Sequence, residues 1–183
     1  MLKPLQLIDL FSSDECRQIV AIAHAGIFHD AALTGSKQSD AVRLAQTSWI
    51  NEEGAASWIF SRLLEAFAKS NREHFDFKLD HFSERMQVAW YDAESSAFFD
   101  WHSDVGMSPL SNRRKLTMVV QLSDAENYLG GELETNSDGN IRAASRCIGS
   151  ALVLPSFVLH RVRPVTCGNR YSLTLWSHGP AFR

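Results

Sequence analysis

The stretch ALVLPSFVLHRVRPVTCGNRYSLTLW, residues 151–176, decides the fold class. It holds three short runs rich in apolar residues, at 151–154, 158–162 and 170–176, and they are separated by Pro155, Pro164 and the pair Gly168-Asn169. Proline, glycine and asparagine are typical of turns, and short apolar runs between turn residues predict β-strands. The stretch therefore predicts a mainly β fold, either a sandwich or a barrel.

The residues before this stretch add further strands. From residue 85 the apolar pattern has a period of two, which is the repeat of a β-strand, and 116–122 is another apolar run. Gly130-Gly131 and Asp138-Gly139-Asn140 are turn sequences, and the second indicates a hairpin. We therefore expect β structure from residue 85 onward.

Two helices are expected in the first 80 residues. Ser12 and Glu15 have the spacing of a capping box, and Gly26 can end the helix that follows them. The second helix covers 55–74, where the apolar residues form one broad face. A polar loop is expected at 30–40 and a strand at 42–50. We expect the helices to pack on the outside of one sheet, because each must bury its apolar face.

Composition sets the class of protein. The chain has 183 residues, of which 45% are hydrophobic and 21% charged, and its net charge is -3. This is the composition of one globular domain, 1–183, and the absence of a basic excess argues against a nucleic-acid partner. No apolar run approaches the roughly 18 residues that a membrane span needs, and we expect no signal peptide. Three widely spaced cysteines fit a reducing compartment, so a cytoplasmic location is expected: Cys16, Cys147 and Cys167.

Three residues have the chemistry of a metal site. His102 and Asp104 are two positions apart, so on a strand both side chains point to the same face. His160 lies 58 positions later, inside the expected strand 158–162. Two histidines and one carboxylate are the ligands of non-haem Fe(II) oxygenases, and they leave coordination positions open. A lone histidine-X-aspartate sequence is common, and a lone strand histidine is more often a core or surface residue.

Arg170 gives this cluster a specific interpretation. It lies ten positions after His160, with turn residues between, so we expect it to start the strand adjacent to that of His160. Its face of the strand also carries Ser172, Thr174 and Trp176, while the opposite face is apolar. A guanidinium on a buried face needs an anion, and its planar fork matches a carboxylate. The alternative partner is a structural acid, Glu132 or Glu134.

The chain resembles the prolyl-4-hydroxylase-like branch of the 2-oxoglutarate/Fe(II)-dependent dioxygenases. The resemblance covers about two thirds of the chain and is carried by MQVAWYDAESSAFFDWHSD (86–104), RRKLTMVVQLSDAENYLGGELE (113–134) and GSALVLPSFVLHRVRPVTCGNRYSLTLW (149–176), with SNREHFDFKL (70–79) as part of a supporting helix. It implies a double-stranded β-helix, also called a jelly roll and similar to the cupins. Helical support would then occupy about 1–80 and the jelly-roll core about 81–183.

The same resemblance implies cofactors and an activity. Fe(II) would be bound by His102, Asp104 and His160, and 2-oxoglutarate by Arg170 with Ser172 as a second donor. O2 would be consumed, with ascorbate as a reductant. The expected reaction hydroxylates a peptidyl or free amino-acid side chain and releases succinate and CO2. Two alternatives stay open: a non-catalytic metal- and 2-oxoglutarate-binding sensor on the same barrel, and a zinc-dependent hydrolase.

Further site residues follow from the resemblance. Tyr91 and Gln121 occupy positions where related hydroxylases place groups near the co-substrate, although a glutamine departs from the tyrosine found in those enzymes. Trp176 resembles the aromatic wall of the iron pocket, with plain core packing as its alternative. Apart from the resemblance, Arg43, Trp101 and Trp176 are expected to contact the substrate. The sequence does not identify the substrate itself.

Overall fold

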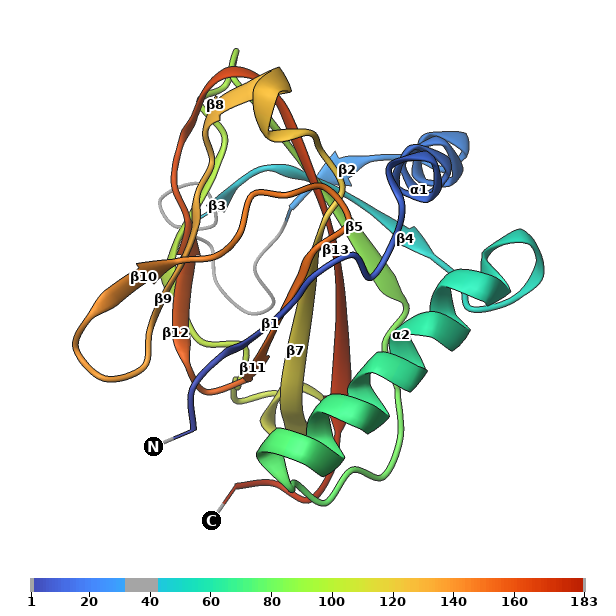
Figure 1. Cartoon of the computed structure of the whole chain (residues 1–183), viewed down its shortest axis with the longest axis vertical. Coiled ribbons are helices and arrows are strands. Elements are labelled where there is room, and N and C mark those ends of the chain that lie inside the picture. Colours follow the sequence, from blue (N-terminus) through green and yellow to red (C-terminus); the bar gives the residue numbers. More distant parts are fainter. Residues whose placement is uncertain (1, 32–42, 183) are drawn as a thin grey trace.

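The alternating strands form two β-sheets that face each other. The computed structural model describes residues 2–31 and 43–182, and Figure 1 shows the sheets with two helices outside one of them. The larger sheet has the order β1-β11-β7-β13-β5-β4-β2, with β8 paired to β13, and the smaller has the order β10-β9-β12-β6-β3. All pairs are antiparallel. This is the expected double-stranded β-helix.

The strands of the larger sheet are β1 (Leu5–Leu7), β2 (His29–Asp30), β4 (Gln46–Ile50), β5 (Met86–Asp92), β7 (Arg114–Gln121), β8 (Tyr128–Gly130), β11 (Ala151–Pro155) and β13 (Val165–His178). Those of the smaller sheet are β3 (Arg43–Leu44), β6 (Phe98–His102), β9 (Leu133–Asn136), β10 (Ile141–Ala143) and β12 (Leu159–Val162). The hairpin that joins β9 and β10 confirms the turn predicted at 138–140.

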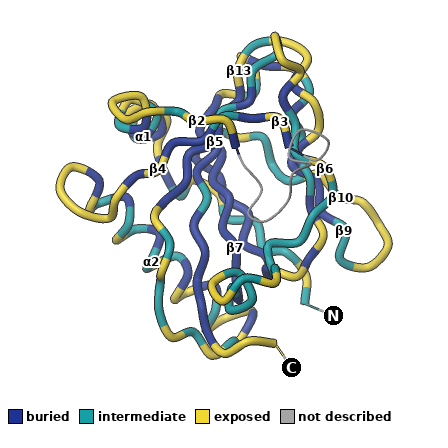
Figure 2. Tube along the Cα trace, turned by 180° about the vertical axis from the view of Figure 1, so that it is seen from behind, coloured by how far each residue is buried: buried dark blue, intermediate teal, exposed yellow. Residues whose placement is uncertain are grey.

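The period of two along each central strand separates two hydrophobic cores. On β5, Met86 and Val88 point to the core beneath the helices, whereas Ala89 and Tyr91 point to the core between the sheets. Both faces of β5, β7 and the part of β13 from Arg170 onward are therefore largely buried, as the dark central strands of Figure 2 show. A polar residue on the inner face of these strands has no bulk water beside it, so it must find a partner or bind one.

The two helices cover the outer face of the larger sheet, as predicted. Helix α1 (Ser13–Ala25) begins with the predicted capping box, in which Glu15 N–H donates to Ser12 and the Glu15 carboxylate accepts from Ser12 N–H, and it ends at Gly26. Helix α2 (Ser57–Ser70) follows a 3₁₀ turn (Gly54–Ala56) and continues as a π turn (Asn71–Phe75). Further 3₁₀ turns span Ser111–Arg113 and Ala125–Asn127. No helix in the described ranges is long and apolar enough to cross a membrane.

Two expectations about the strands were wrong. The region predicted as one strand at 42–50 is divided, because β3 pairs with β6 in the smaller sheet while β4 pairs with β5 in the larger one. Residue 42 and most of the loop predicted at 30–40 lie outside the described residues.

The second wrong expectation concerns Arg170, which does not start a strand next to that of His160. Strand β13 begins at Val165 and pairs with β5, β7 and β8, so Arg170 and His160 lie on opposite sheets. The first 80 residues also contribute strands β1 to β4 to the sheets.

Candidate active site

Two histidines of the smaller sheet face each other across a strand pair. His102 ends β6 and His160 lies on β12, and the two residues are direct partners in the antiparallel register. Their ring centroids are 4.1 Å apart. A bulge in the same pair places Phe99 on the face of His102, and the two rings stack at a centroid distance of 3.4 Å. The register of β6 against β12 therefore brings together two imidazoles that are 58 positions apart in sequence.

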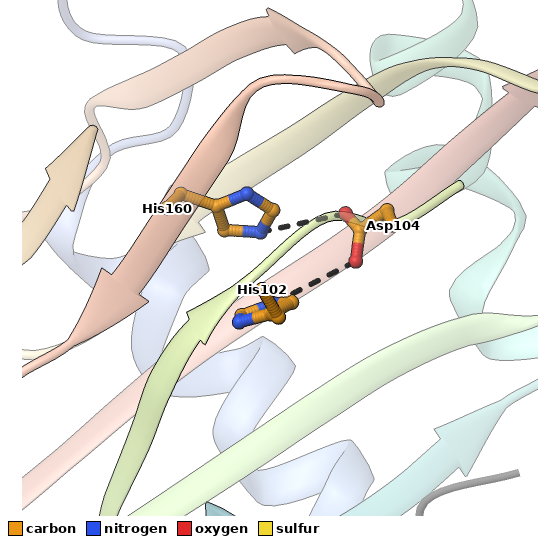
Figure 3. Close-up of side chains that lie close together, drawn as sticks. All are labelled: His102, Asp104 and His160. Atoms are coloured by element: carbon orange, nitrogen blue, oxygen red, sulfur yellow. Dashed lines mark ion pairs between the residues drawn. The ribbon is translucent and has the colours of Figure 1, made fainter. Parts of the chain in front are cut away.

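Asp104 completes the cluster from beyond the end of β6. One carboxylate oxygen lies 3.7 Å from His102 Nε2 and the other 3.5 Å from His160 Nε2 (Figure 3). One ligand atom from each of the three residues lies within 4.8 Å of the others, which is close enough for a shared metal ion. Strand alternation was expected to orient Asp104, but its main-chain N–H instead donates to the Ser156 carbonyl at 2.9 Å. The loop after β11 thus fixes the carboxylate.

The Nδ1 atom of each imidazole forms a hydrogen bond with a main-chain carbonyl. His102 Nδ1 lies 2.7 Å from the Asp100 carbonyl, and His160 Nδ1 lies 2.9 Å from the Val158 carbonyl. A carbonyl can only accept, so both Nδ1 atoms carry a proton, and in a neutral ring Nε2 then presents its lone pair to the cluster. Burial, with the neighbouring His160, lowers the pKa of His102 to about 3. The imidazole is therefore neutral at physiological pH, which is the form that binds a metal.

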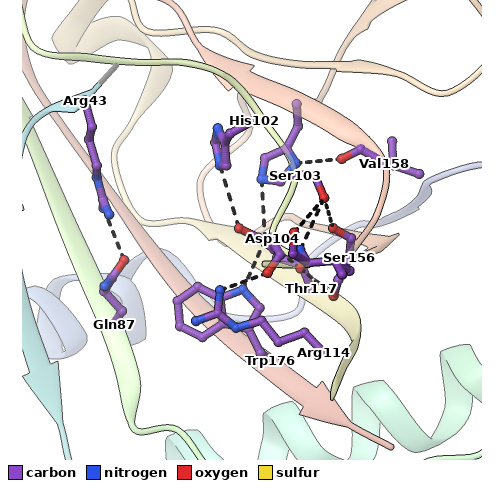
Figure 4. Close-up of polar contacts among 12 residues, drawn as sticks. Arg43, Gln87, His102, Ser103, Asp104, Arg114, Thr117, Ser156, Val158 and Trp176 are labelled. Atoms are coloured by element: carbon purple, nitrogen blue, oxygen red, sulfur yellow. Dashed lines mark hydrogen bonds and ion pairs between the residues drawn. The ribbon is translucent and has the colours of Figure 1, made fainter. Parts of the chain in front are cut away.

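Asp104 is held as an anion by groups from two strands of the larger sheet. Thr117 Oγ1 donates to the Asp104 carboxylate at 2.7 Å and Trp176 Nε1 donates to the same oxygen at 3.0 Å (Figure 4). Thr117 and Trp176 are partners in the β7–β13 register, which explains why both reach one atom. Burial alone would raise the pKa of Asp104, but His160, His102 and Arg114 together hold it below its ordinary value. The carboxylate is thus available as a ligand.

Trp176 has a contact that the sequence did not indicate. It was expected to form an aromatic wall or part of the core, and it is indeed buried between the sheets. Its indole N–H, however, positions Asp104, and its ring lies 4.1 Å from the guanidinium carbon of Arg114. Arg114 in turn donates to the Asp104 carbonyl at 3.2 Å. Thr117 and Arg114 were not predicted, because a contact between β7 and the end of β6 depends on the tertiary fold.

Arg170 lies fully buried on the inner face of the larger sheet. Its Nη2 donates to Gln121 Oε1 at 2.9 Å, and its guanidinium lies 5.2 Å from the centre of the Tyr91 ring. No described residue accepts a hydrogen bond from Nε or Nη1. The structural acids considered as partners are engaged elsewhere, Glu132 with Arg146 and Glu134 with Arg161. Arg170 therefore has two nitrogen atoms whose N–H groups are free to bind a ligand.

Further side chains surround Arg170. Ser172 is buried two positions along the same strand face, opposite Gln121 in the register. Tyr128, which was not predicted, accepts a hydrogen bond from Gln121 Nε2 at 2.6 Å and thereby fixes the amide that holds Arg170. Tyr91 and Gln121 thus contact the guanidinium, and Ser172 lies on the same strand face. Gly131 also matters here: a Cβ on it would lie 2.9 Å from Arg170 Cδ.

Two of the three predicted substrate contacts, Arg43 and Trp101, lie on opposite faces of the smaller sheet. Arg43 is buried on the inner face, over the ring of Phe99. Trp101 lies on the outer face, where its ring contacts the guanidinium of Arg161, and the structure does not bring it to the cluster. Strand alternation gives the reason: His102 and His160 point inward, so their neighbours Trp101 and Arg161 point outward.

Fold and site together define a class. A double-stranded β-helix with two histidines and a carboxylate on its inner face, and a buried arginine across from them, has the donor set of the mononuclear non-haem iron proteins. Comparison with known proteins gives the family. The sequence model of the 2OG-Fe(II) oxygenase superfamily matches residues 86–178, just over half of the chain. The chain belongs to this superfamily.

Relatives and solved structures agree with this membership. A PKHD-type hydroxylase of Pseudomonas putida is 27% identical over 179 residues, covering 94% of this chain and 77% of that protein. A PKHD-type hydroxylase of Pseudomonas fluorescens is 34% identical over 84 residues, which span 43% of this chain but only 37% of that protein. These relatives support a hydroxylase, and neither the sensor nor the zinc-hydrolase alternative is favoured.

Two solved structures share the fold. A Pseudomonas putida prolyl-4-hydroxylase superposes with a TM-score of 0.75 at 22% identity, covering 97% of this chain and 93% of that one. A prolyl hydroxylase from Trichoplax adhaerens, solved with a peptide of the hypoxia inducible factor, gives 0.79 at 18% identity, covering 96% of this chain and 83% of that one. At these identities the likeness concerns the fold, and the prolyl-hydroxylase-like jelly roll is confirmed.

Proposed function

We propose that this chain is an Fe(II)- and 2-oxoglutarate-dependent dioxygenase whose site combines His102, Asp104 and His160 with Arg170. The observation that carries the proposal is Arg170: it is fully buried and two of its nitrogen atoms, Nε and Nη1, have no acceptor among the described residues. An unpaired buried guanidinium is costly, so the site is complete only when it holds an anion. The distal carboxylate of 2-oxoglutarate meets that need.

Each residue has a role in this proposal. His102 and His160 offer Nε2 and Asp104 offers a carboxylate oxygen to the metal, while Thr117 and Trp176 orient that carboxylate. Iron, when bound to three such ligands, supplies the open positions that a chelating keto acid and dioxygen require. Arg170 and Ser172 hold the far carboxylate of the keto acid, with Gln121 and Tyr91 beside them. The barrel keeps bulk water from this space.

The proposed reaction converts a C–H bond, 2-oxoglutarate and O2 into C–OH, succinate and CO2. Two of the four electrons that reduce O2 come from decarboxylation of the keto acid and two from the C–H bond. The substrate is a peptidyl or free amino-acid side chain, in keeping with the prolyl-hydroxylase-like fold. Ascorbate is proposed as the reductant that restores Fe(II). We also propose that 1–183 works as one domain in the cytoplasm, where the three free cysteines would stay reduced.

Anaerobic titration tests cofactor and co-substrate together. Addition of Fe(II) and then 2-oxoglutarate to the protein should produce a visible charge-transfer absorption from the chelate, and admission of air should then release succinate. Zn(II) in place of Fe(II) should produce neither signal. Absence of the absorption with both components present, or hydrolytic activity that persists without oxygen, would contradict the proposal and favour the hydrolase alternative.

A further inference from the structure

A second buried guanidinium lies on the inner side of the barrel. Arg43, on β3, is 9% exposed, and its Nη2 donates to Gln87 Oε1 at 3.2 Å (Figure 4). Gln87 is itself buried and neutral, so it satisfies one hydrogen bond without balancing the charge. No described residue accepts from Arg43 Nε, and no carboxylate of the described chain forms an ion pair with this residue. By the argument applied to Arg170, this cation also needs an anion.

Arg43 lies close to the metal cluster. Its guanidinium carbon is 4.6 Å from the centre of the Phe99 ring, and the Phe99 ring stacks directly on His102. A group held by Arg43 would therefore lie beside the metal ligands, where a substrate must be placed.

The anion that Arg43 requires is different from the one proposed for Arg170. Arg43 bonds to Gln87, whereas Arg170 lies over Tyr91, four residues further along the same face of β5. Four residues of strand span about 13 Å. A keto acid that reaches Arg170 from the metal extends along β5 away from Gln87, so it leaves Arg43 without a partner. The second site is thus available to the primary substrate.

An exposed aromatic ring lies next to this second site. Trp49 on β4 is the register partner of Gln87, so both side chains are on the inner face. The neighbouring Ser48 confirms this orientation, because its hydroxyl bonds to helix α1 on the outer face. Trp49 is 37% exposed, and its ring lies 6.3 Å from that of Trp176. An apolar surface therefore adjoins the cation, and the pair fits a ligand with one carboxylate and an apolar carbon skeleton.

We propose that Arg43, Gln87 and Trp49 bind the primary substrate, and that this substrate is a small molecule with a free carboxylate, of the class of apolar free amino acids. The inference rests on the proposed function and selects one of its two substrate classes. Arg43 is nine-tenths buried, so its partner must enter between the sheets. An internal residue of a polypeptide has no main-chain carboxylate to offer there.

Matched ligands test the requirement for the carboxylate. Wild-type protein with Fe(II), 2-oxoglutarate and O2 would be given the free L-forms of proline, leucine, isoleucine, valine, methionine, phenylalanine and tryptophan, then their carboxamides, then peptides capped at both ends that contain the same residues. At least one free acid should raise succinate release above the uncoupled rate and yield a hydroxylated product. Its carboxamide should bind at least about tenfold more weakly in anaerobic calorimetry, because it lacks the charge that Arg43 pairs with.

Two variants isolate Arg43. Arg43→Gln should raise the KM for the stimulating acid by about tenfold or more, while the KM for 2-oxoglutarate and the charge-transfer absorption stay unchanged. Arg161→Gln is the control, because Arg161 stacks on Trp101 with the same 4.6 Å separation but on the outer face of the smaller sheet. It should leave the KM for the acid unaltered. The unchanged absorption shows that the Arg43→Gln protein is folded and loaded.

The outcomes separate this inference from the proposed function. If the protein shows a normal charge-transfer absorption and uncoupled succinate release, but no free acid increases that release, the inference is overturned and the proposed function stands. The same follows if carboxamides or capped peptides perform as well as the acids, or if Arg43→Gln does not change the KM for the acid. Loss of the absorption in wild-type protein would overturn the proposed function, and the inference with it.

Discussion

Arg170 is the residue on which the co-substrate assignment depends. We expect Arg170→Ala to raise the Kd for 2-oxoglutarate by about two orders of magnitude, since removal of one partner of a buried charged pair costs about 3 kcal/mol. Fe(II) affinity should be nearly unchanged, because the three metal ligands do not contact Arg170. The measurement is the anaerobic charge-transfer titration against 2-oxoglutarate, with Arg17→Ala, a change at an exposed arginine, as the control. Equal affinity in Arg170→Ala and wild type would exclude this role.

Trp176 should act on the metal rather than on the co-substrate. Trp176→Phe removes the indole N–H that donates to Asp104 and keeps an aromatic ring in the core. Loss of a hydrogen bond that orients a metal ligand typically costs about 10- to 100-fold in metal affinity, so we expect a loss of about that size for Fe(II). Trp101→Phe is the matched control, because Trp101 adjoins His102 in sequence but lies on the outer face. A comparable loss of iron affinity in Trp101→Phe would mean that the effect is unspecific.

At the scale of elements, the sequence predicted the strands better than their partners. Alternation revealed β5, and apolar runs bounded by turn residues revealed β7, β11 and the second half of β13. Strand order depends on contacts between distant residues, and no local pattern reports them. The turn residues between His160 and Arg170 suggested that β12 and β13 are neighbours in one sheet. In the structure the connection instead crosses from the smaller sheet to the larger one.

The candidate site was predictable to a similar degree. His102, Asp104, His160 and Arg170 stand out because such polar groups are unusual in apolar strands. The other residues of the site do not stand out in the sequence, because threonine, tyrosine, glutamine and tryptophan are ordinary strand residues. They are Thr117, Tyr128, Gln87 and Trp49. Only the register shows that Thr117 and Trp176 meet at Asp104, and that Trp49 lies beside Gln87.

The connection between β8 and β9 should control the position of Arg170. Gly131 has φ +66°, and a Cβ there would lie 2.9 Å from both Arg170 Cδ and Val165 Cγ2. We expect Gly131→Ala to lower the free energy of unfolding by about 1–2 kcal/mol through left-handed strain, and to raise the KM for 2-oxoglutarate by displacing the guanidinium. Denaturant unfolding and co-substrate titration measure the two effects.

Gly139→Ala provides the control for that substitution. Gly139 has φ +87°, and no heavy atom lies within 4 Å of the position that a Cβ would take there, so an alanine would carry the same kind of backbone strain without the contact. This variant should lose comparable stability with an unchanged KM for 2-oxoglutarate. If both variants raise the KM equally, the effect comes from general destabilisation and not from the packing of Gly131 against Arg170.

At the scale of the whole molecule, one buried charge cluster ties the sheet to the site. Glu84, just before β5, accepts from Arg114 Nε at 2.7 Å and lies 2.9 Å from His178 Nε2 at the end of β13. Arg114 also donates to the Asp104 carbonyl and lies over Trp176. The cluster therefore joins the segment before β5, the start of β7 and the end of β13 to the loop that presents the metal-binding carboxylate.

This cluster makes stability depend on pH. Burial would raise the pKa of Glu84, but the hydrogen bonds from Arg114 and His178 outweigh burial and lower it below the ordinary 4.5. A carboxyl whose pKa is lower in the folded state contributes stability that is fully present above the ordinary pKa, and that contribution is lost as the pH falls through the folded pKa. The free energy of unfolding should thus fall over this acidic range.

Glu84→Gln tests the cluster at both ends of the pH range. At about pH 7 it removes the carboxylate with which Arg114 forms its ion pair, so we expect a loss of about 3 kcal/mol in the free energy of unfolding. Below pH 4.5 the difference from wild type should shrink, because the wild-type carboxyl becomes protonated there. Denaturant unfolding between about pH 7 and pH 3.5 measures this, with Glu73→Gln, at an exposed pair, as a control that should change stability by less than about 0.5 kcal/mol. A difference that stays constant with pH would mean that Glu84 stabilises the fold by packing and hydrogen bonding, and not through its charge.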